Sequence, residues 1–84
     1  MALKRSKEAV IADILNLCVG GASKTRIVYR TNMNFTTAGT YIDKLINIGL
    51  LQITNGDQTI YKTTERGREI LKGLKSIQKE IAQL

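Results

Sequence analysis

Eighty-four residues are enough for one small domain, and a hydrophobic content of 43% excludes a largely disordered chain. Thirteen Lys and Arg residues against seven Asp and Glu residues give a net charge of +6, which favours a polyanionic partner, with nucleic acid ahead of an acidic membrane surface. No apolar run approaches the roughly 20 residues of a membrane helix, and "MALKRSKEAV" lacks the apolar region of a secretory signal, so we expect a cytoplasmic protein.

Residues 6 to 19 predict the first helix. The apolar residues that recur there at helical spacing are Val10, Ile11, Ile14, Leu15 and Cys18. Ser6 can cap the N-terminus, and the Gly20-Gly21 pair ends the helix. Cys18 is expected to be a small buried hydrophobe; the alternative is a reactive thiol. One cysteine and no histidine cannot supply a zinc site within one chain, and no cofactor is expected.

Two further helices are expected between residues 23 and 49. The first follows Ser23 in "SKTRIVYRT", and its apolar content is Ile27, Val28 and Tyr29. The segment "TNMN" breaks this helix, and Asn34 can cap the next one. Gly49 then ends the third helix.

The third helix has two distinct faces on a helical wheel. Its apolar side comprises Phe35, Ala38, Ile42 and Leu45, with Tyr41 and Ile46 at the flanks. Its polar side comprises Thr36, Thr37, Thr40, Asp43, Lys44 and Asn47. Threonine is a mediocre helix former, but its short hydroxyl and methyl groups can approach a base edge or a phosphate closely. We therefore expect this face to enter a DNA groove; the alternative is an ordinary solvated face.

After Gly49 the pattern changes from helical to strand-like. "LLQIT" and "QTIYKTT" flank residues 55–57, Asn-Gly-Asp, and Asn-Gly is a strong hairpin signal. Leu51 and Ile53 alternate with polar residues on the first strand, and Thr64 can cap a long final helix. The order predicts a mainly α fold with a small β-hairpin, the winged helix-turn-helix. In that arrangement helix three can enter the major groove and the hairpin tip can reach the backbone or minor groove.

The final helix carries an apolar seam. Its members step by four and three residues: Ile70, Leu74, Ile77, Ile81 and Leu84. This a/d spacing is typical of a coiled coil, and Leu71 widens the seam toward the winged domain. We expect residues 1–64 to form a DNA-binding domain and residues 65–84 to be a dimerisation helix. The alternative is that the first half of this helix packs on its own domain.

The expected DNA-binding residues come from helix two, helix three and the hairpin. Lys24, Thr25 and Arg26 begin helix two, which crosses the phosphate backbone in such a motif. The other expected contacts are Arg30, Asn34, Thr36, Thr37, Thr40, Tyr41, Lys44, Asn55, Gln58 and Lys62. The polar face of helix three has no arginine, the commonest specific reader of guanine, and Asp43 would repel phosphate. Backbone and shape contacts are therefore expected to dominate.

The segments "GASKTRIVYRTNMNF", "YIDKLINIGLL" and "TERGREIL" resemble the archaeal small winged-helix proteins, in particular the 10 kDa dimeric chromatin-type DNA-binding proteins of Sulfolobus. The resemblance covers nearly the whole chain. It implies a homodimer joined by an antiparallel coiled coil of the C-terminal helices. It also implies that Lys24, Thr25, Arg26, helix three and the wing face DNA. The final helix, which stops at Leu84, is shorter than in that family.

We therefore expect a homodimeric, nucleoid-associated protein that binds double-stranded DNA as a transcriptional regulator or an architectural chromatin protein. A winged-helix module that docks another protein is the alternative. An enzyme is not expected, because the sequence shows no histidine, no nucleophile with a partnered base and no phosphate-binding Gly-rich loop. No membrane partner, metal or small-molecule ligand is expected.

Overall fold

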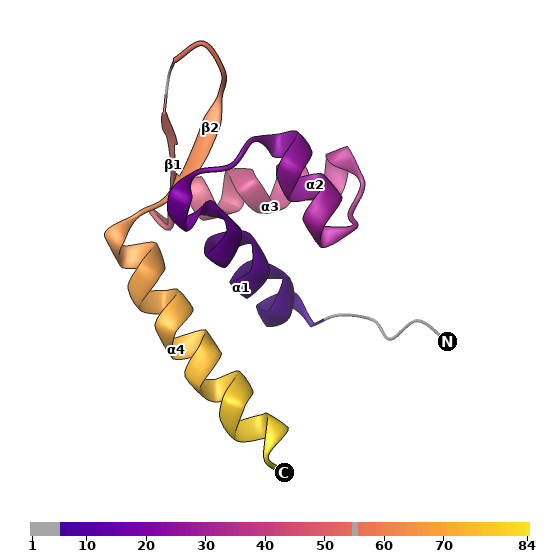
Figure 1. The fold of residues 1–84 in the computed structure, drawn as a ribbon, viewed down its shortest axis with the longest axis vertical. Coiled ribbons are helices and arrows are strands. Elements are labelled where there is room, and N and C mark those ends of the chain that lie inside the picture. The colour runs from indigo at the N-terminus through magenta and orange to yellow at the C-terminus, as the bar shows by residue number, and fades with distance from the viewer. Residues whose placement is uncertain (1–5, 55) are drawn as a thin grey trace.

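The fold is mainly helical, with one two-stranded antiparallel hairpin (Figure 1). The structure is a computed structural model that describes residues 6–54 and 56–84. The elements are α1 (Lys7–Leu17), a 3₁₀ turn η1 (Cys18–Gly20), α2 (Lys24–Thr31), α3 (Phe35–Asn47), β1 (Leu51–Thr54), β2 (Ile60–Thr63) and α4 (Glu65–Ala82). This order confirms the predicted winged helix-turn-helix arrangement.

Each α-helix begins at a side-chain cap. The side chains of Ser6, Ser23, Asn34 and Thr64 accept hydrogen bonds from backbone N–H groups three residues further on, at 3.1, 3.2, 2.7 and 3.0 Å. Each cap satisfies a donor that the helix itself leaves unpaired, and is typically worth about 1 kcal/mol. The helix starts predicted from these four residues are therefore confirmed.

The first helix ends earlier than its apolar pattern predicts. α1 stops at Leu17, and η1 follows because Gly21 takes a left-handed φ of 94° and donates its N–H to the carbonyl of Cys18 at 3.0 Å. Ala22 then forms a bridge with Tyr61, with N–H···O distances of 2.9 and 2.8 Å in the two directions. The linker between α1 and α2 thus adds a third extended segment beside β2.

The loop of the hairpin is longer than the Asn-Gly signal predicts. The strands pair from Leu51 opposite Thr63 to Thr54 opposite Ile60, so Gln58 and Thr59 lie in the loop and not in the second strand. The hydroxyl of Thr54 donates to the carbonyl of Ile60 at 3.1 Å and closes the ladder at that point. The hairpin projects beyond the helical body (Figure 1), and consequently only its base is covered. Leu51 at the base of the hairpin is buried, whereas Ile53, further along the same strand, is 46% exposed.

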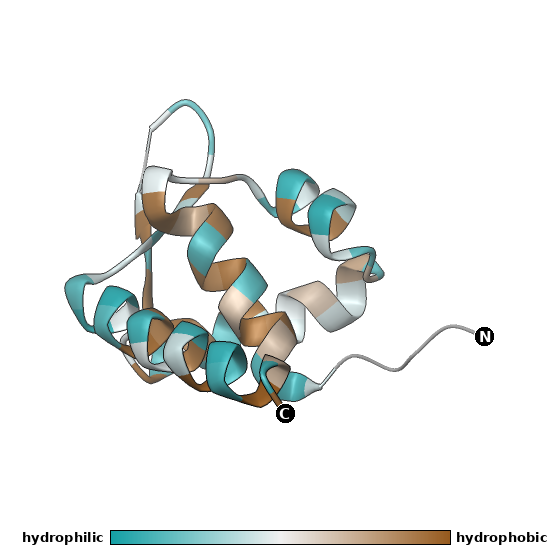
Figure 2. Cartoon of the chain, turned by 60° about the horizontal axis from the view of Figure 1, so that its bottom comes forward, coloured by the Kyte–Doolittle hydropathy of each residue, from teal (hydrophilic) through white to brown (hydrophobic). Residues whose placement is uncertain are grey.

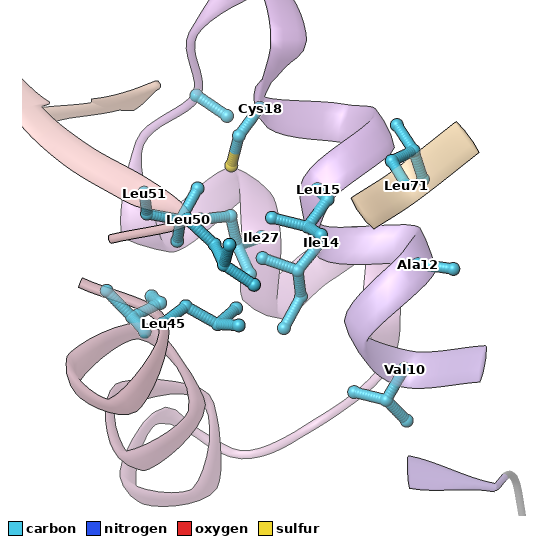
Figure 3. Close-up of a cluster of buried hydrophobic side chains, with 12 residues drawn as sticks. Val10, Ala12, Ile14, Leu15, Cys18, Ile27, Leu45, Leu50, Leu51 and Leu71 are labelled. Atoms are coloured by element: carbon cyan, nitrogen blue, oxygen red, sulfur yellow. The ribbon is translucent and has the colours of Figure 1, made fainter. Parts of the chain in front are cut away.

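A single core joins the helices to the base of the hairpin (Figure 3). Its fully buried large side chains include Ile14, Leu15, Ile27, Ile42 and Leu51. Figure 3 also shows the thiol of Cys18 pointing into this cluster, and Leu71 of α4 beside α1. Burying such side chains contributes about 1.5–3 kcal/mol each. The expected buried role of Cys18 is confirmed.

Thr64 fixes the start of α4 to the end of α3. Its N–H donates to the carbonyl of Leu50 at 3.0 Å, and its hydroxyl donates to the carbonyl of Gly49 at 2.6 Å. Further along α4, the ammonium of Lys75 donates to the side-chain oxygen of Asn16 in α1 at 2.8 Å. α4 therefore packs along α1, and the first half of α4 belongs to the core of its own chain.

The apolar seam of α4 is only partly covered within the chain. Leu71 is 5% exposed and Leu74 packs partly against the core. The other members are exposed: Ile70 at 42%, Ile77 at 55%, Ile81 at 60% and Leu84 at 103%. Figure 2 shows hydrophobic segments recurring along α4 toward its C-terminal end. Across the described residues, no helix is both long and apolar enough to cross a membrane.

Candidate nucleic-acid interface

The turn between α2 and α3 gives the helix-turn-helix its shape. Asn32 takes a left-handed conformation, φ 58° and ψ 35°, which asparagine tolerates better than most residues. Ile27 and Thr31 are buried on the inner side of α2, and the hydroxyl of Thr31 donates to the carbonyl of Ile27 at 2.6 Å. The outer side of α2 is consequently presented to solvent together with the start of α3.

The polar face of α3 lies in solvent, as the helical wheel predicts. Ala38, Ile42 and Leu45 are buried on its opposite side. The exposed residues of the polar face are Thr36, Thr37, Thr40, Asp43, Lys44 and Asn47. The hydroxyl of Thr40 donates to the carbonyl of Thr36 at 3.1 Å, and its oxygen keeps acceptor capacity. The face therefore offers short acceptors and methyl groups, which fit base edges in a groove.

The two arginines of α2 lie toward α1 and η1: Arg30 lines a hollow with Asp13, Asn16 and Leu17 of α1, and the charge of Arg26 acts on the thiol of Cys18. Arg26 and Arg30 are both exposed, as is Thr25, and the sequence of α2 contains no acidic residue. Between the two arginines lies Tyr29, which is 87% exposed. Of the three residues that make up the apolar content of α2, Ile27 is buried, Val28 is half-buried and Tyr29 lies in solvent.

Lys24 behaves differently from the arginines, because its side chain lies across α3. Its ammonium is 5.9 Å from the centroid of the Phe35 ring, within the range of a cation–π contact. A Cβ built on Gly39 would lie only 2.9 Å from the same ammonium. The absence of a side chain at Gly39 therefore makes room for Lys24. The glycine in the middle of a helix was the available sequence signal, since such a residue costs helix stability.

The burial predicted for Phe35 from the helical wheel is wrong. The wheel places it on the buried side of α3, but the ring is 52% exposed. It is the first residue of α3, where the helix has not yet reached the core, and it packs beside Lys24 instead. An exposed aromatic ring thus lies at the start of the proposed groove helix.

The remaining expected contacts are spread over the cap, the wing and the side of α3 that faces α1. Asn34 is exposed while it caps α3. On the hairpin, Gln58 and Lys62 are exposed, and Asn55 lies outside the described residues. Tyr41 is half-buried; it packs against the core and lines a groove between α1 and α3. The structure thus places Tyr41 beside the threonine face, toward α1.

The thiol of Cys18 is buried in the core and does not belong to the exposed surface of α2 and α3. Burial raises the pKa of the Cys18 thiol from 9.0 to about 11, and the charge of Arg26 opposes that shift. The thiol is therefore protonated and shielded at neutral pH, unlike reactive cysteines. Within the described part of the chain, no three His, Cys, Asp or Glu side chains gather as a metal site. The exposed chemistry is that of hydroxyls, methyls, amides and cations.

Comparison with known proteins identifies the family of the chain and solved structures that share its fold. The sequence profile described as "Winged helix-turn-helix" matches residues 4–82. Sso10a-2, a DNA-binding protein from Sulfolobus solfataricus, is similar in structure with a TM-score of 0.85 and 30% identity, over 94% of this chain and 84% of that chain. No curated protein sequence matches the chain.

Two further solved structures share the fold at lower identity. The transcriptional regulator BldR from Sulfolobus solfataricus has a TM-score of 0.82 and 18% identity, over 88% of this chain; this chain spans only 57% of its length. AF1382 from Archaeoglobus fulgidus has a TM-score of 0.76 and 18% identity, over 94% of this chain and 90% of that chain. These likenesses concern the fold.

Proposed function

We propose a function from one premise: the chain belongs to the winged helix-turn-helix family. It binds double-stranded DNA with the surface formed by α2, α3 and the hairpin, and acts as a transcriptional regulator or an architectural chromatin protein. Two observations carry the proposal: the threonine face of α3 is exposed, and α2, which precedes it in the motif, has the exposed Arg26 and Arg30 and no acidic residue. The 30% identity with a DNA-binding protein supports it.

The proposed mechanism needs no chemical step. α3 enters the major groove with Thr36, Thr37 and Thr40, as recognition helices of this motif do. Arg26 and Arg30 of α2 neutralise phosphates and release their counterions. The wing, with Gln58, Lys62 and the expected Asn55, reaches the neighbouring backbone or groove.

Sequence selectivity is proposed to be modest. The polar face of α3 has one lysine, Lys44, one acid, Asp43, and no arginine. Bidentate arginine contacts to guanine supply much of the specificity in other DNA-binding helices. In this protein the threonine contacts and the shape of the DNA distinguish one DNA sequence from another, while the phosphate contacts supply most of the affinity.

We propose that the active form is a homodimer joined through α4. The seam residues Ile70, Ile77, Ile81 and Leu84 are exposed in the single chain, and they repeat at a/d spacing. An antiparallel pairing of two α4 helices covers both seams and sets the spacing of the two DNA-binding surfaces. The site of action follows from the ligand: the nucleoid of the cytoplasm.

A charge-reversal experiment tests the DNA contact directly. Arg26→Glu together with Arg30→Glu should weaken binding to a labelled duplex by more than about tenfold at moderate salt, because each lost phosphate contact is replaced by repulsion. Fluorescence anisotropy measures the affinity. The matched control is Lys72→Glu with Lys79→Glu, the same charge change on the exposed side of α4.

Equal losses in the two double variants would contradict the proposed surface, since general charge alone would then account for binding. Retention of full affinity by the α2 variant would favour the other candidate, a winged-helix module that docks a protein. One observation favours this second candidate: the exposed face of α3 is nearly neutral, because it carries both Lys44 and Asp43.

A further inference from the structure

A groove lies between the N-terminal half of α1 and the C-terminal half of α3. Its volume is about 590 Å³, and its walls include Lys7 and Ile11 from α1 and Tyr41, Lys44, Leu45 and Ile48 from α3 and its C-cap. Neither helix pattern alone indicates such a groove, because residues of both helices form its walls.

The groove combines an apolar floor with a cationic rim. Leu45 is buried, Ile11 and Tyr41 are half-buried against the core, and Ile48 is 56% exposed. Lys7 and Lys44 are exposed at its two sides. None of the described residues that line it is acidic. A volume of this size falls within the range of small-molecule sites, which are mainly apolar with a few polar groups that orient the ligand.

We propose that this groove binds a small amphipathic organic anion, specifically an aromatic carboxylate. The aromatic part packs on Ile11, Tyr41 and Leu45, and the carboxylate pairs with Lys7 and Lys44. Charge complementarity favours this occupant: Lys7 and Lys44 line the groove together with an apolar floor, and none of its described lining residues is acidic. A neutral aromatic molecule would satisfy the floor but leave both cations unpaired.

Occupation of the groove is coupled to DNA binding; this step rests on the function proposed above. Thr40, Lys44 and Asn47 line the groove and also belong to the polar face of α3. A bound anion would engage Lys44 and place a negative charge beside the DNA-facing surface. The ligand and DNA therefore weaken each other's binding by the same factor, because coupling between two sites is reciprocal.

The first test uses the full chain without DNA. 1-Naphthoate is titrated against the protein while amide shifts are followed by ¹H–¹⁵N NMR, with 1-naphthalenemethanol as the uncharged control. The saturable shifts should centre on Ile11, Tyr41 and Ile48, and naphthoate should bind about tenfold more tightly than the alcohol, as expected for a charge-assisted contact. Lys7→Gln should lose most of that preference, whereas Lys72→Gln on α4 should keep it.

Three results would overturn the groove as an anion site: no saturable binding, equal affinity for the acid and the alcohol, or shifts centred elsewhere. Amide shifts at the groove that change with protein concentration, and not with naphthoate, would show that a second copy of the chain occupies the groove. That result would also overturn the proposed anion site.

The second test measures duplex affinity with and without saturating naphthoate. Wild-type protein should bind DNA about tenfold more weakly with the ligand present, within the usual range of coupling between sites. Lys7→Gln should bind DNA normally and respond less to the ligand. Unchanged DNA affinity at a saturated groove would overturn the coupling. A chain that binds naphthoate but no duplex would contradict the proposed function alone, so the two failures are distinguishable.

Discussion

The α-carbon of Gly67 packs directly against the backbone of Leu50. A Cβ built at Gly67 would overlap the carbonyl oxygen of Leu50 and lie 2.6 Å from the methyl carbon of Thr63. The first turn of α4 therefore rests on the segment that joins α3 to β1. Because a backbone carbonyl cannot move aside as a flexible side chain can, glycine is required at this position.

Gly67→Ala should destabilise the protein, although alanine is the better helix former. The overlap should cost about 1–3 kcal/mol, or more, in the free energy of unfolding. Gly73→Ala in the same helix is the matched control: its Cβ would meet nothing within 4 Å, and the change should stabilise by up to about 1 kcal/mol. Urea denaturation of both variants measures the difference. Shifts of the same sign would contradict the packing of α4 on Leu50.

Thr64 should contribute more than an ordinary helix cap. Its hydroxyl accepts from the N–H of Gly67 and also donates to the carbonyl of Gly49. Thr64→Val, which removes both hydrogen bonds, should cost about 2–3 kcal/mol, and Thr64→Ser should cost little. Ser23→Ala removes a cap alone and should cost about 1 kcal/mol. If thermal unfolding gave Thr64→Val the same loss as Ser23→Ala, the second hydrogen bond would have no energetic role.

Cys18 should make stability depend on alkaline pH. Burial raises the pKa of its thiol from 9.0 to about 11, so the thiol contributes stability that is complete below about pH 9 and is lost as pH rises through 11. At about pH 8 the folded protein should react slowly with a thiol reagent, and the urea-unfolded protein should react at once. Absorbance of the released chromophore measures both rates. Rapid stoichiometric reaction of the folded protein would contradict the buried position.

The α4 seam should control oligomeric state. Ile77→Lys together with Ile81→Lys places two charges in the proposed interface and should convert a dimer of the 9.3 kDa chain to a monomer. Lys72→Gln together with Lys79→Gln, on the other side of α4, should leave the dimer intact. Light scattering across a range of protein concentrations gives the mass. A wild-type monomer at every concentration, or a variant that still dimerises, would contradict the proposed interface.

The features that could be predicted from sequence depend on contacts within a few residues. The caps at Ser6, Ser23, Asn34 and Thr64 each act over three residues, and for that reason the helix starts agree with the sequence. The buried side of α3 follows from its period, except at Phe35. The helical period predicts which side of α3 a residue lies on. It does not predict whether other parts of the chain cover that side at the end of the helix, where Phe35 lies.

The features that could not be predicted depend on how the elements meet. Ala22 pairs with Tyr61, and Lys24 lies in the space left by Gly39; both relationships cross between elements whose arrangement has no local signal. The groove between α1 and α3 is of the same kind. The DNA-facing residues themselves remain predictions, because exposure at Thr36 or Arg26 is compatible with any partner of suitable chemistry.

The most direct test of the central claim is the salt dependence of binding to several unrelated duplexes. The expected phosphate contacts of one chain are Lys24, Arg26, Arg30, Lys44 and Lys62. Five such contacts should give a slope of log K against log salt of about −4.5 per chain. Affinities for the different sequences should lie within about tenfold of one another, since α3 offers few bidentate readers. A slope near zero, or no binding to any duplex at low salt, would contradict the account.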